Sequence, residues 1–244
     1  MKTRLFVGIV ALLIVGVLVM PTSAKATTYP LTIDHCTGGC LTTPSGGNVI
    51  VVQNGANDVQ LTVNLASYLE FINTGLHDTF DFNIVGAPAI TTSGLPTHFA
   101  LSSGSPGAAH HFDGFGDFEY SIALDTAQGA GGAQCPTVIG FTGCTLQFDV
   151  VASGLTPASF ATFGGEQVNC TTNKKGVTSC DTVTSNVFFG VDVLSLQSLG
   201  GTGKTGPIGN GEPLPPPPVP EPASIVLFGS GLVGLAGLLR RKLR

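Results

Sequence analysis

Polar and apolar residues alternate with a period of two along most of the middle of this chain. In residues 58–65 every second side chain is Val or Leu, and those between them are Asp, Gln, Thr and Asn. Such alternation is typical of a β-strand with one buried face and one face in water. Residues 80–84, 118–125 and 146–150 show the same alternation, and further strands are expected at 48–53, 68–73, 97–102, 158–163 and 185–194. Clusters of Gly, Pro, Asn and Ser separate them, and the pattern predicts an all-β fold, an antiparallel, jelly-roll-like β-sandwich over residues 27–199.

The first 26 residues have a different pattern. Lys2 and Arg4 precede an unbroken apolar run over residues 5–20, and Ala24 and Ala26 form a small-x-small site. A basic start, an apolar run and such a site are the three parts of a secretory signal peptide. We therefore expect export through the Sec translocon and cleavage by signal peptidase after Ala26.

The C-terminal part of the chain begins with a segment poor in strand formers. Residues 200–218 are rich in Gly and Pro and are expected to be a linker. The 17-residue apolar stretch that follows, at 223–239, is just long enough for a transmembrane helix. Basic residues close the chain and are expected to stay in the cytoplasm, so the body of the protein lies on the other side of the membrane.

Residues 219–244 resemble the PEP-CTERM sorting signal of bacterial surface proteins. The matching residues are Val219, Pro220, Glu221 and Pro222 before the apolar stretch, and Arg240, Arg241 and Lys242 after it. The resemblance implies that an exosortase cuts the chain near Pro-Glu-Pro while it is transiently anchored in the inner membrane. It also implies a final place at the cell surface or in the extracellular matrix of a Gram-negative bacterium, where such proteins accompany polysaccharide and biofilm.

Charge is unevenly distributed along the chain. The formal net charge is −5, but both ends are basic, and all 15 acidic residues lie in 27–221 together with only three lysines. The body is therefore strongly acidic. This charge excludes nucleic acid as a partner, because phosphate binding needs clustered Lys and Arg.

The six cysteines form three pairs that are close in sequence: Cys36 with Cys40, Cys135 with Cys144, and Cys170 with Cys180. In an exported protein this spacing favours disulfides that staple loops. The alternative is a metal site built from His35, Cys36 and Cys40. Zinc sites of this kind use a second tight pair of ligands, which the chain lacks.

Residues 110–117 (HHFDGFGD) concentrate two His and two Asp around two Gly. The simplest interpretation is a Gly-rich turn that leads into a strand. The alternative is a Ca²⁺ site with Asp113 and Asp117 as oxygen ligands. His110 and His111 are neighbours, and on an extended chain they point to opposite faces, which argues against joint chelation. No other cofactor is expected.

No catalytic constellation stands out in the sequence. The chain lacks a G-x-S-x-G motif. Residues 198–205 (SLGGTGKT) resemble part of a phosphate-binding loop, but Gly206 and Pro207 follow where that loop requires a helix. We therefore expect a non-enzymatic surface protein with a structural or adhesive role. The alternatives are a secreted glycan- or calcium-binding module and a surface hydrolase.

Overall fold

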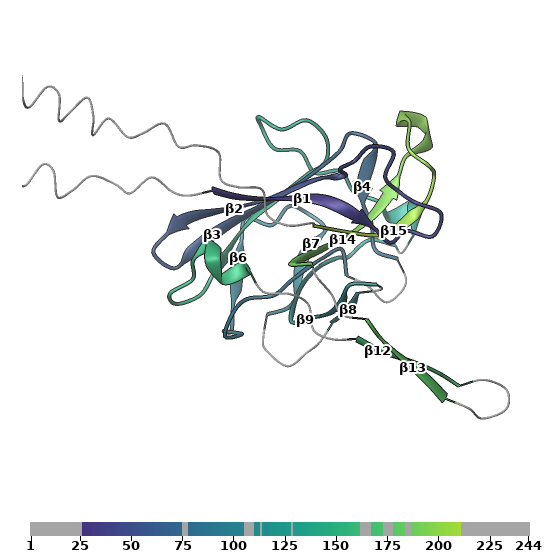
Figure 1. Cartoon of the computed structure of the whole chain (residues 1–244). Helices are drawn as coiled ribbons and strands as arrows, with labels where there is room; N and C mark the ends of the chain where they lie inside the picture. Colours follow the sequence, from purple (N-terminus) through teal and green to yellow (C-terminus); the bar gives the residue numbers. More distant parts are fainter. Residues whose placement is uncertain are drawn as a thin grey trace, which may run out of the picture.

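The computed structural model describes residues 26–74, 78–104, 110–112, 114–127, 129–161, 167–172, 178–183 and 187–210 (Figure 1). Within these ranges the protein is all-β, as predicted, with three short 3₁₀ helices. The strands are β1 (Ala26–Asp34), β2 (Gly47–Gly55), β3 (Asp58–Leu65), β4 (Leu69–Phe71), β5 (Phe80–Phe82), β6 (Thr91–Ser93), β7 (Phe99–Ser103), β8 (His110–Phe112), β9 (Gly116–Phe118), β10 (Tyr120–Leu124), β11 (Thr145–Val151), β12 (Gln167–Thr172), β13 (Thr178–Val183), β14 (Phe189–Ser195) and β15 (Thr205–Asn210). The 3₁₀ helices are η1 (Ala130–Gly132), η2 (Pro157–Phe160) and η3 (Gln197–Leu199).

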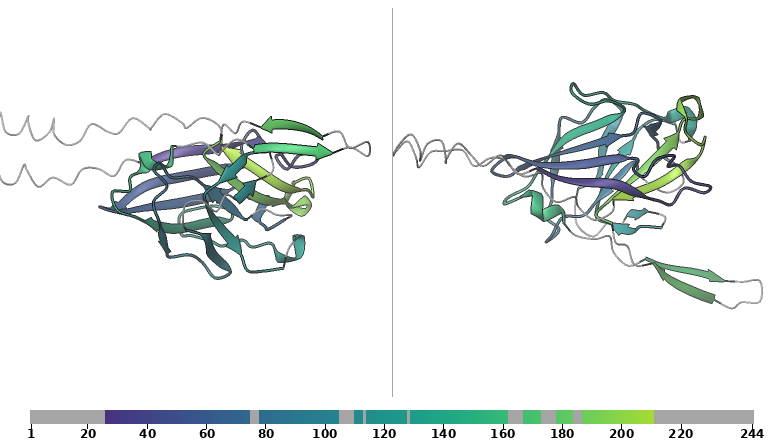
Figure 2. Two further views of the ribbon diagram at one scale, coloured as in Figure 1. Left: turned by 90° about the horizontal axis from the view of Figure 1, so that it is seen from below. Right: turned by 45° about the horizontal axis from the view of Figure 1, so that its top comes forward.

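Eleven strands form one antiparallel sheet. Its order is β6-β11-β3-β2-β1-β15-β14-β5-β10-β7, and β4 pairs with β14 outside this path. The sheet changes direction at β1, where residues 26–30 pair with β2 and residues 31–34 pair with β15, with a shift in register between Leu31 and Ile33. A strand that passes from one layer to another through such an irregularity makes the corner between them. The two layers expected of a sandwich are thus halves of one continuous sheet (Figures 1 and 2).

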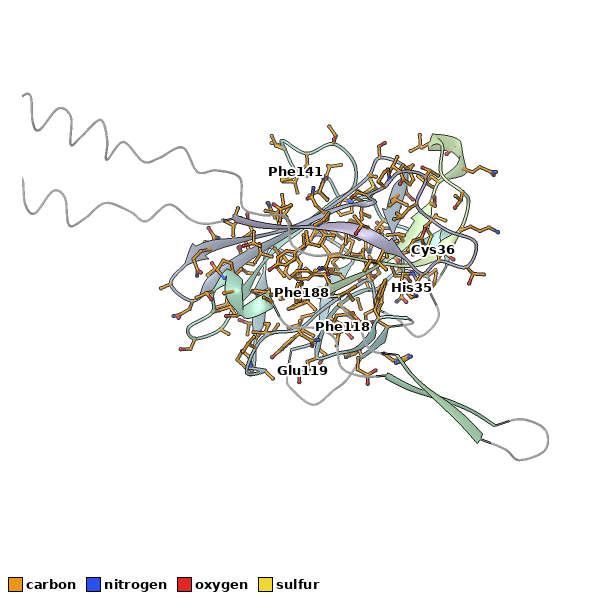
Figure 3. All side chains as sticks on the ribbon, in the orientation of Figure 1. His35, Cys36, Phe118, Glu119, Phe141 and Phe188 are labelled. Carbon is orange, nitrogen blue, oxygen red and sulfur yellow. A yellow bond between two sulfur atoms is a disulfide. The ribbon has the colours of Figure 1, made fainter. Side chains whose placement is uncertain are left out.

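A single large core lies between the two halves (Figure 3). It is rich in phenylalanine: the ring of Phe80 lies 5.6 Å from Phe82, 5.8 Å from Phe189 and 6.1 Å from Phe148, centroid to centroid. Phe80 and Phe82 come from β5, Phe189 from β14 and Phe148 from β11 in the other half. Aromatic contacts therefore tie the two halves together.

A second, smaller core covers the outer face of the β15-β14-β5 region. It consists of Phe112, Phe115, Phe118 and Val187, with Ile33 packed against it. A Cβ atom built on Gly190 of β14 would lie 2.9 Å from the ring of Phe112, so the β8–β9 hairpin sits directly on the strand backbone. This half of the sheet is covered on both faces. The expectation of one face in water is wrong for β5, and β14 is likewise buried on both faces over most of its length.

The expected linker at 200–218 is wrong over its first part. Residues 205–210 form β15, which lies between β1 and β14 and is buried from Gly206 to Asn210. The folded body therefore extends beyond residue 199. Glycines had suggested a linker here, but Gly209 allows close packing against the strand. A Cβ atom on Gly209 would lie 2.9 Å from two ring carbons of Phe115.

Most other strand predictions are confirmed, and 58–65 has the observed bounds. The segment 158–163 is wrong, because Pro157–Phe160 forms η2, whose start is favoured by Pro157 and by a capping box between Thr156 and Ser159. The strands β1, β6, β8, β12 and β13 have no counterpart among the predicted segments. The β12–β13 hairpin extends away from the rest of the body (Figure 2).

Both predicted membrane-related segments, the signal peptide and the helix at 223–239, lie outside the described residues apart from Ala26. None of the helical segments inside the described ranges has the length and hydropathy that a bilayer crossing requires.

Candidate functional site

A carboxylate lies buried beneath the β8–β9 hairpin. Asp81 is in the middle of β5, between Ser121 of β10 and Gly190 of β14, and it is fully buried. Among the described residues, neither of its carboxylate oxygens has a hydrogen-bond partner. Its burial raises the pKa of Asp81 well above the ordinary value, and the nearby carboxylates of Asp78 and Asp192 raise it further.

Two hydroxyl groups share this environment. Thr79 precedes Asp81 by two residues and therefore lies on the same face of the chain, while Ser121 is directly opposite Asp81. Both residues are fully buried, and their hydroxyl oxygens have no hydrogen-bond partner in the part of the chain that the structure describes. The outer face of β5 and β10 thus holds three buried polar groups for which no described residue supplies a hydrogen bond.

Two more carboxylates border this group. Asp192 of β14 is opposite Thr79, since its amide donates to the Thr79 carbonyl oxygen at 3.0 Å. Its Oδ2 accepts hydrogen bonds from the Thr74 amide and hydroxyl, both at 2.6 Å. Asp78 Oδ2 lies 3.2 Å from His110 Nδ1 in β8, and this pair is mostly buried. We call Asp78, Thr79, Asp81, Ser121 and Asp192 the acidic cluster.

The predicted calcium ligands are not part of this cluster. Asp117 is in β9 and its Oδ1 lies 3.0 Å from His111 Nδ1, with both side chains partly exposed. Asp113 lies outside the described residues. The two neighbouring histidines diverge as expected, His110 toward Asp78 and His111 toward Asp117. Calcium binding by Asp113 and Asp117 stays a prediction.

The first cysteine pair forms a disulfide. Cys36 and Cys40 are bonded, and the Asp34 carboxylate accepts hydrogen bonds from the amides of Cys36, Cys40 and Leu41 at 2.8–2.9 Å. Asp34, Cys36 and Cys40 are the only group of three Asp, Glu, His or Cys side chains in the described ranges whose potential ligand atoms all lie within 4.8 Å of one another. Both sulfur atoms are used in the disulfide, and His35 packs edge-on against Phe115, so the alternative of a metal site from His35, Cys36 and Cys40 is not supported.

The second pair, Cys135 and Cys144, also forms the predicted disulfide. For the third pair the structure describes only the backbone, in which Cys170 lies directly opposite Cys180 in the β12–β13 hairpin. This register agrees with the predicted pairing.

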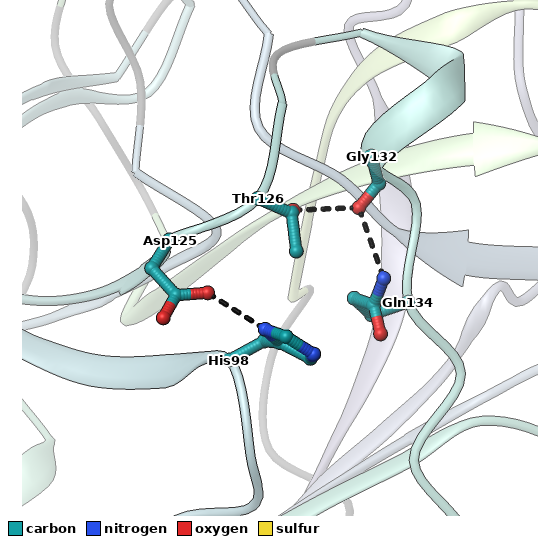
Figure 4. Close-up of polar contacts among 5 residues, drawn as sticks. All are labelled: His98, Asp125, Thr126, Gly132 and Gln134. Atoms are coloured by element: carbon teal, nitrogen blue, oxygen red, sulfur yellow. Dashed lines mark hydrogen bonds and ion pairs between the residues drawn. The ribbon is translucent and has the colours of Figure 1, made fainter.

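An exposed histidine–aspartate pair lies at the other end of β10 (Figure 4). His98 Nδ1 is 2.9 Å from Asp125 Oδ1, and the His98 backbone has a positive φ of 73°. The nearest hydroxyl drawn, that of Thr126, donates to the Gly132 carbonyl oxygen at 2.7 Å and not to the imidazole. A histidine–aspartate pair without an aligned nucleophile does not make a catalytic triad.

Sequence reasoning missed Asp81 and Asp192 because each alternates with apolar residues and therefore suggested a solvent-facing position. One signal was present: the pattern apolar-Asp-apolar occurs in both 80–82 and 191–193. Pairing these segments in one sheet brings the two aspartates to the same face.

Comparison with known proteins gives one match. A family model of the PEP-CTERM protein-sorting motif matches residues 218–242. The match contains the predicted sorting residues, which lie outside the described part of the structure. No curated protein and no solved structure matches the chain.

Proposed function

We propose that this exported surface protein, whose PEP-CTERM motif at residues 218–242 marks it for processing by an exosortase, has a structural or adhesive role outside the cell. The sorting motif is the observation that carries the proposal. The motif indicates that the protein is exported to the cell surface. The body is therefore expected to act there and not on a cytoplasmic substrate.

The body has properties that suit this role. Its two described disulfides are typical of proteins that fold in an oxidising compartment. Both halves of the sheet pack on one core, which supports treating residues 26–210 as one sandwich-like, jelly-roll-like module. Its strong negative charge favours cation-mediated association with an anionic matrix such as extracellular polysaccharide.

The proposed route to the surface follows the segments at the two ends. Residues 1–26 act as the signal peptide, and residues 223–239 anchor the chain transiently in the inner membrane of a Gram-negative bacterium. The exosortase then cuts near Pro220, Glu221 and Pro222, and the body passes to the cell surface or to the biofilm matrix.

The route is tested by cell fractionation and intact-mass measurement in a host that has an exosortase. We expect a mature protein that begins at Thr27, lacks the apolar stretch and is two hydrogen masses lighter for each disulfide. Replacing residues 220–222 (PEP) by alanines should leave the full C-terminus attached in the membrane fraction. The matched control replaces residues 215–217 (PPP) by alanines and should be processed normally. Recovery of an intact C-terminus on the wild-type surface protein would refute the processing step.

The role is tested separately on the processed protein. We expect it to sediment with extracellular polysaccharide from its host and to be released by added salt or by a chelator. It should show no turnover on a panel of polysaccharide and ester substrates. Efficient turnover of any of these substrates would favour the surface hydrolase, and absence of both binding and turnover would contradict the adhesive role.

A further inference from the structure

The acidic cluster contains more buried polar groups than the described residues satisfy. Thr79, Asp81 and Ser121 are fully buried, and the side-chain oxygens of all three have no hydrogen-bond partner among the described residues. Burying a carboxylate without a partner costs several kcal/mol, so such groups in proteins are paired or bind a metal ion. The two hydroxyls are evidence independent of the carboxylates. An ion bound at this place would have to coordinate neutral hydroxyl oxygens as well as charged carboxylate oxygens.

The arrangement presents oxygen atoms from three neighbouring strands. Asp81 of β5 is flanked by Ser121 of β10, and Asp192 of β14 is its diagonal neighbour on the same face, at about 7–8 Å between Cα atoms. Thr79 lies next to both aspartates. Carboxylate and hydroxyl oxygens without a nitrogen or sulfur ligand are the chemistry that a hard cation requires.

The surrounding contacts hold this site in place. Thr74 fixes one oxygen of Asp192 with two hydrogen bonds, and His110 holds Asp78 at the edge of the cluster. The ring of Phe112 lies over Gly190, which is the neighbour of Asp81 across the β5–β14 pair. The oxygens of Asp78, Asp81 and Asp192 do not all lie within 4.8 Å of one another, and Asp78 is paired with His110 at the edge, so Asp78 is not counted among the ligands.

We propose that the acidic cluster binds one Ca²⁺ ion through the carboxylates of Asp81 and Asp192 and the hydroxyls of Thr79 and Ser121. Calcium fits better than magnesium because it accepts irregular shells of six to eight oxygens, whereas magnesium demands a near-ideal octahedron. The ion neutralises the cluster and so fastens the β8–β9 hairpin to the sheet. This site is different from Asp113 and Asp117, and it does not depend on the adhesive role.

The test uses the exported protein in the form in which the producing cells release it. Its thermal unfolding is measured in EDTA, in 5 mM CaCl₂ and in 5 mM MgCl₂. Modules of extracellular proteins bind Ca²⁺ with Kd values of about 10⁻⁴–10⁻³ M. For a body of this size, 5 mM Ca²⁺ should then raise Tm by roughly 2–9 °C. Calorimetric titration with CaCl₂ should give one ion per chain, and Mg²⁺ should have a smaller effect.

Three variants locate the ion. Asp81→Asn keeps the shape of the side chain, should fold with an unchanged or higher Tm in EDTA, and should lose the Ca²⁺ shift. Ser121→Ala, which removes one neutral ligand, should reduce the affinity at least several-fold. Asp117→Asn is the matched control and should keep the full shift.

Three outcomes would overturn the site. The first is a wild-type protein that shows neither a Tm shift nor binding heat with CaCl₂. The second is a shift that survives in Asp81→Asn. The third is a shift that is lost in Asp117→Asn, which would place the ion at Asp113 and Asp117 instead. None of these outcomes bears on exosortase processing or on polysaccharide binding, so the two proposals fail independently.

Discussion

Substituting Gly209 by alanine tests whether the last strand is an integral part of the sheet. Gly209 lies in β15, opposite Gly190 of β14 and Ile33 of β1. The added Cβ would be 2.9 Å from Cε1 and Cζ of Phe115 and 3.0 Å from Cγ1 of Val187. Both neighbours are almost completely buried and belong to the small second core, so neither ring nor methyl group can turn into solvent.

Two opposing terms set the size of the effect. Forcing an extra methyl group into a packed core costs typically about 1–3 kcal/mol. Replacing glycine by alanine also restricts the unfolded chain, which stabilises the folded state by about 0.4–1 kcal/mol. The net loss should therefore be about 1–2 kcal/mol, equivalent to a fall in Tm of roughly 2–8 °C for a body of this size.

The assay is chemical and thermal denaturation of the exported protein. Gly131→Ala is the control, because its Cβ would have no atom within 4 Å and its φ is not positive, so only the unfolded-state term should act. Combining Gly209→Ala with Phe115→Leu should cost less than the sum of the single changes, since the smaller side chain makes room. If Gly209→Ala is as harmless as Gly131→Ala, residues 205–210 are a tether, as their composition suggested.

Three further predictions concern single contacts. Replacing both Cys135 and Cys144 by alanine should lower the free energy of unfolding by about 2–3 kcal/mol, from the nine-residue separation that the disulfide closes; an unchanged denaturation midpoint would contradict this. Burial, with a smaller effect of Glu119, raises the pKa of Tyr120 to about 12, above its unfolded value of 10.0. The neutral phenol is thus favoured in the folded state, and stability that is complete below pH 10 should fall by about 2 kcal/mol as the pH rises toward 12. Tyr120→Phe should flatten this part of the pH profile, and parallel profiles for the two proteins would refute the cause. Asp34→Ala should cost about 1–3 kcal/mol by leaving three amide donors unsatisfied, and hydrogen exchange should show faster loss of protection at these amides than in Asp34→Asn; equal protection would argue against the carboxylate as their acceptor.

Local sequence indicated most strands of the large sheet but not how they are covered. Asp149 follows Phe148 and precedes Val150, just as Asp81 lies between two phenylalanines. Asp149 is partly exposed and accepts hydrogen bonds from Asn54 and Gln60, whereas Asp81 is fully buried. The difference comes from the β8–β9 hairpin, which is distant in sequence and covers only one of the two. Period-two alternation carries no information about such a second layer.

The sorting signal, in contrast to the burial of Asp81, was predictable from sequence. It is recognised as a linear order of Pro-Glu-Pro, apolar and basic segments, and it needs no tertiary contact to be identified. The strand β15 was missed because Gly and Pro are depleted in most strands. The glycines fit here because the backbone of Cys36 and the ring of Phe115 approach Gly206 and Gly209 too closely for a larger residue.

The position of β15 also sets the order of folding events. This strand is the last of the body to leave the ribosome, yet it lies in the middle of the sheet and joins β1 to β14. Until residue 210 is available, no pair of described strands joins one half of the sheet to the other, and non-local closure of this kind is slow. The sorting motif begins at residue 218, only a few residues later. Completion of the fold and arrival of the processing signal are therefore nearly simultaneous, and a chain truncated before β15 would expose two open strand edges.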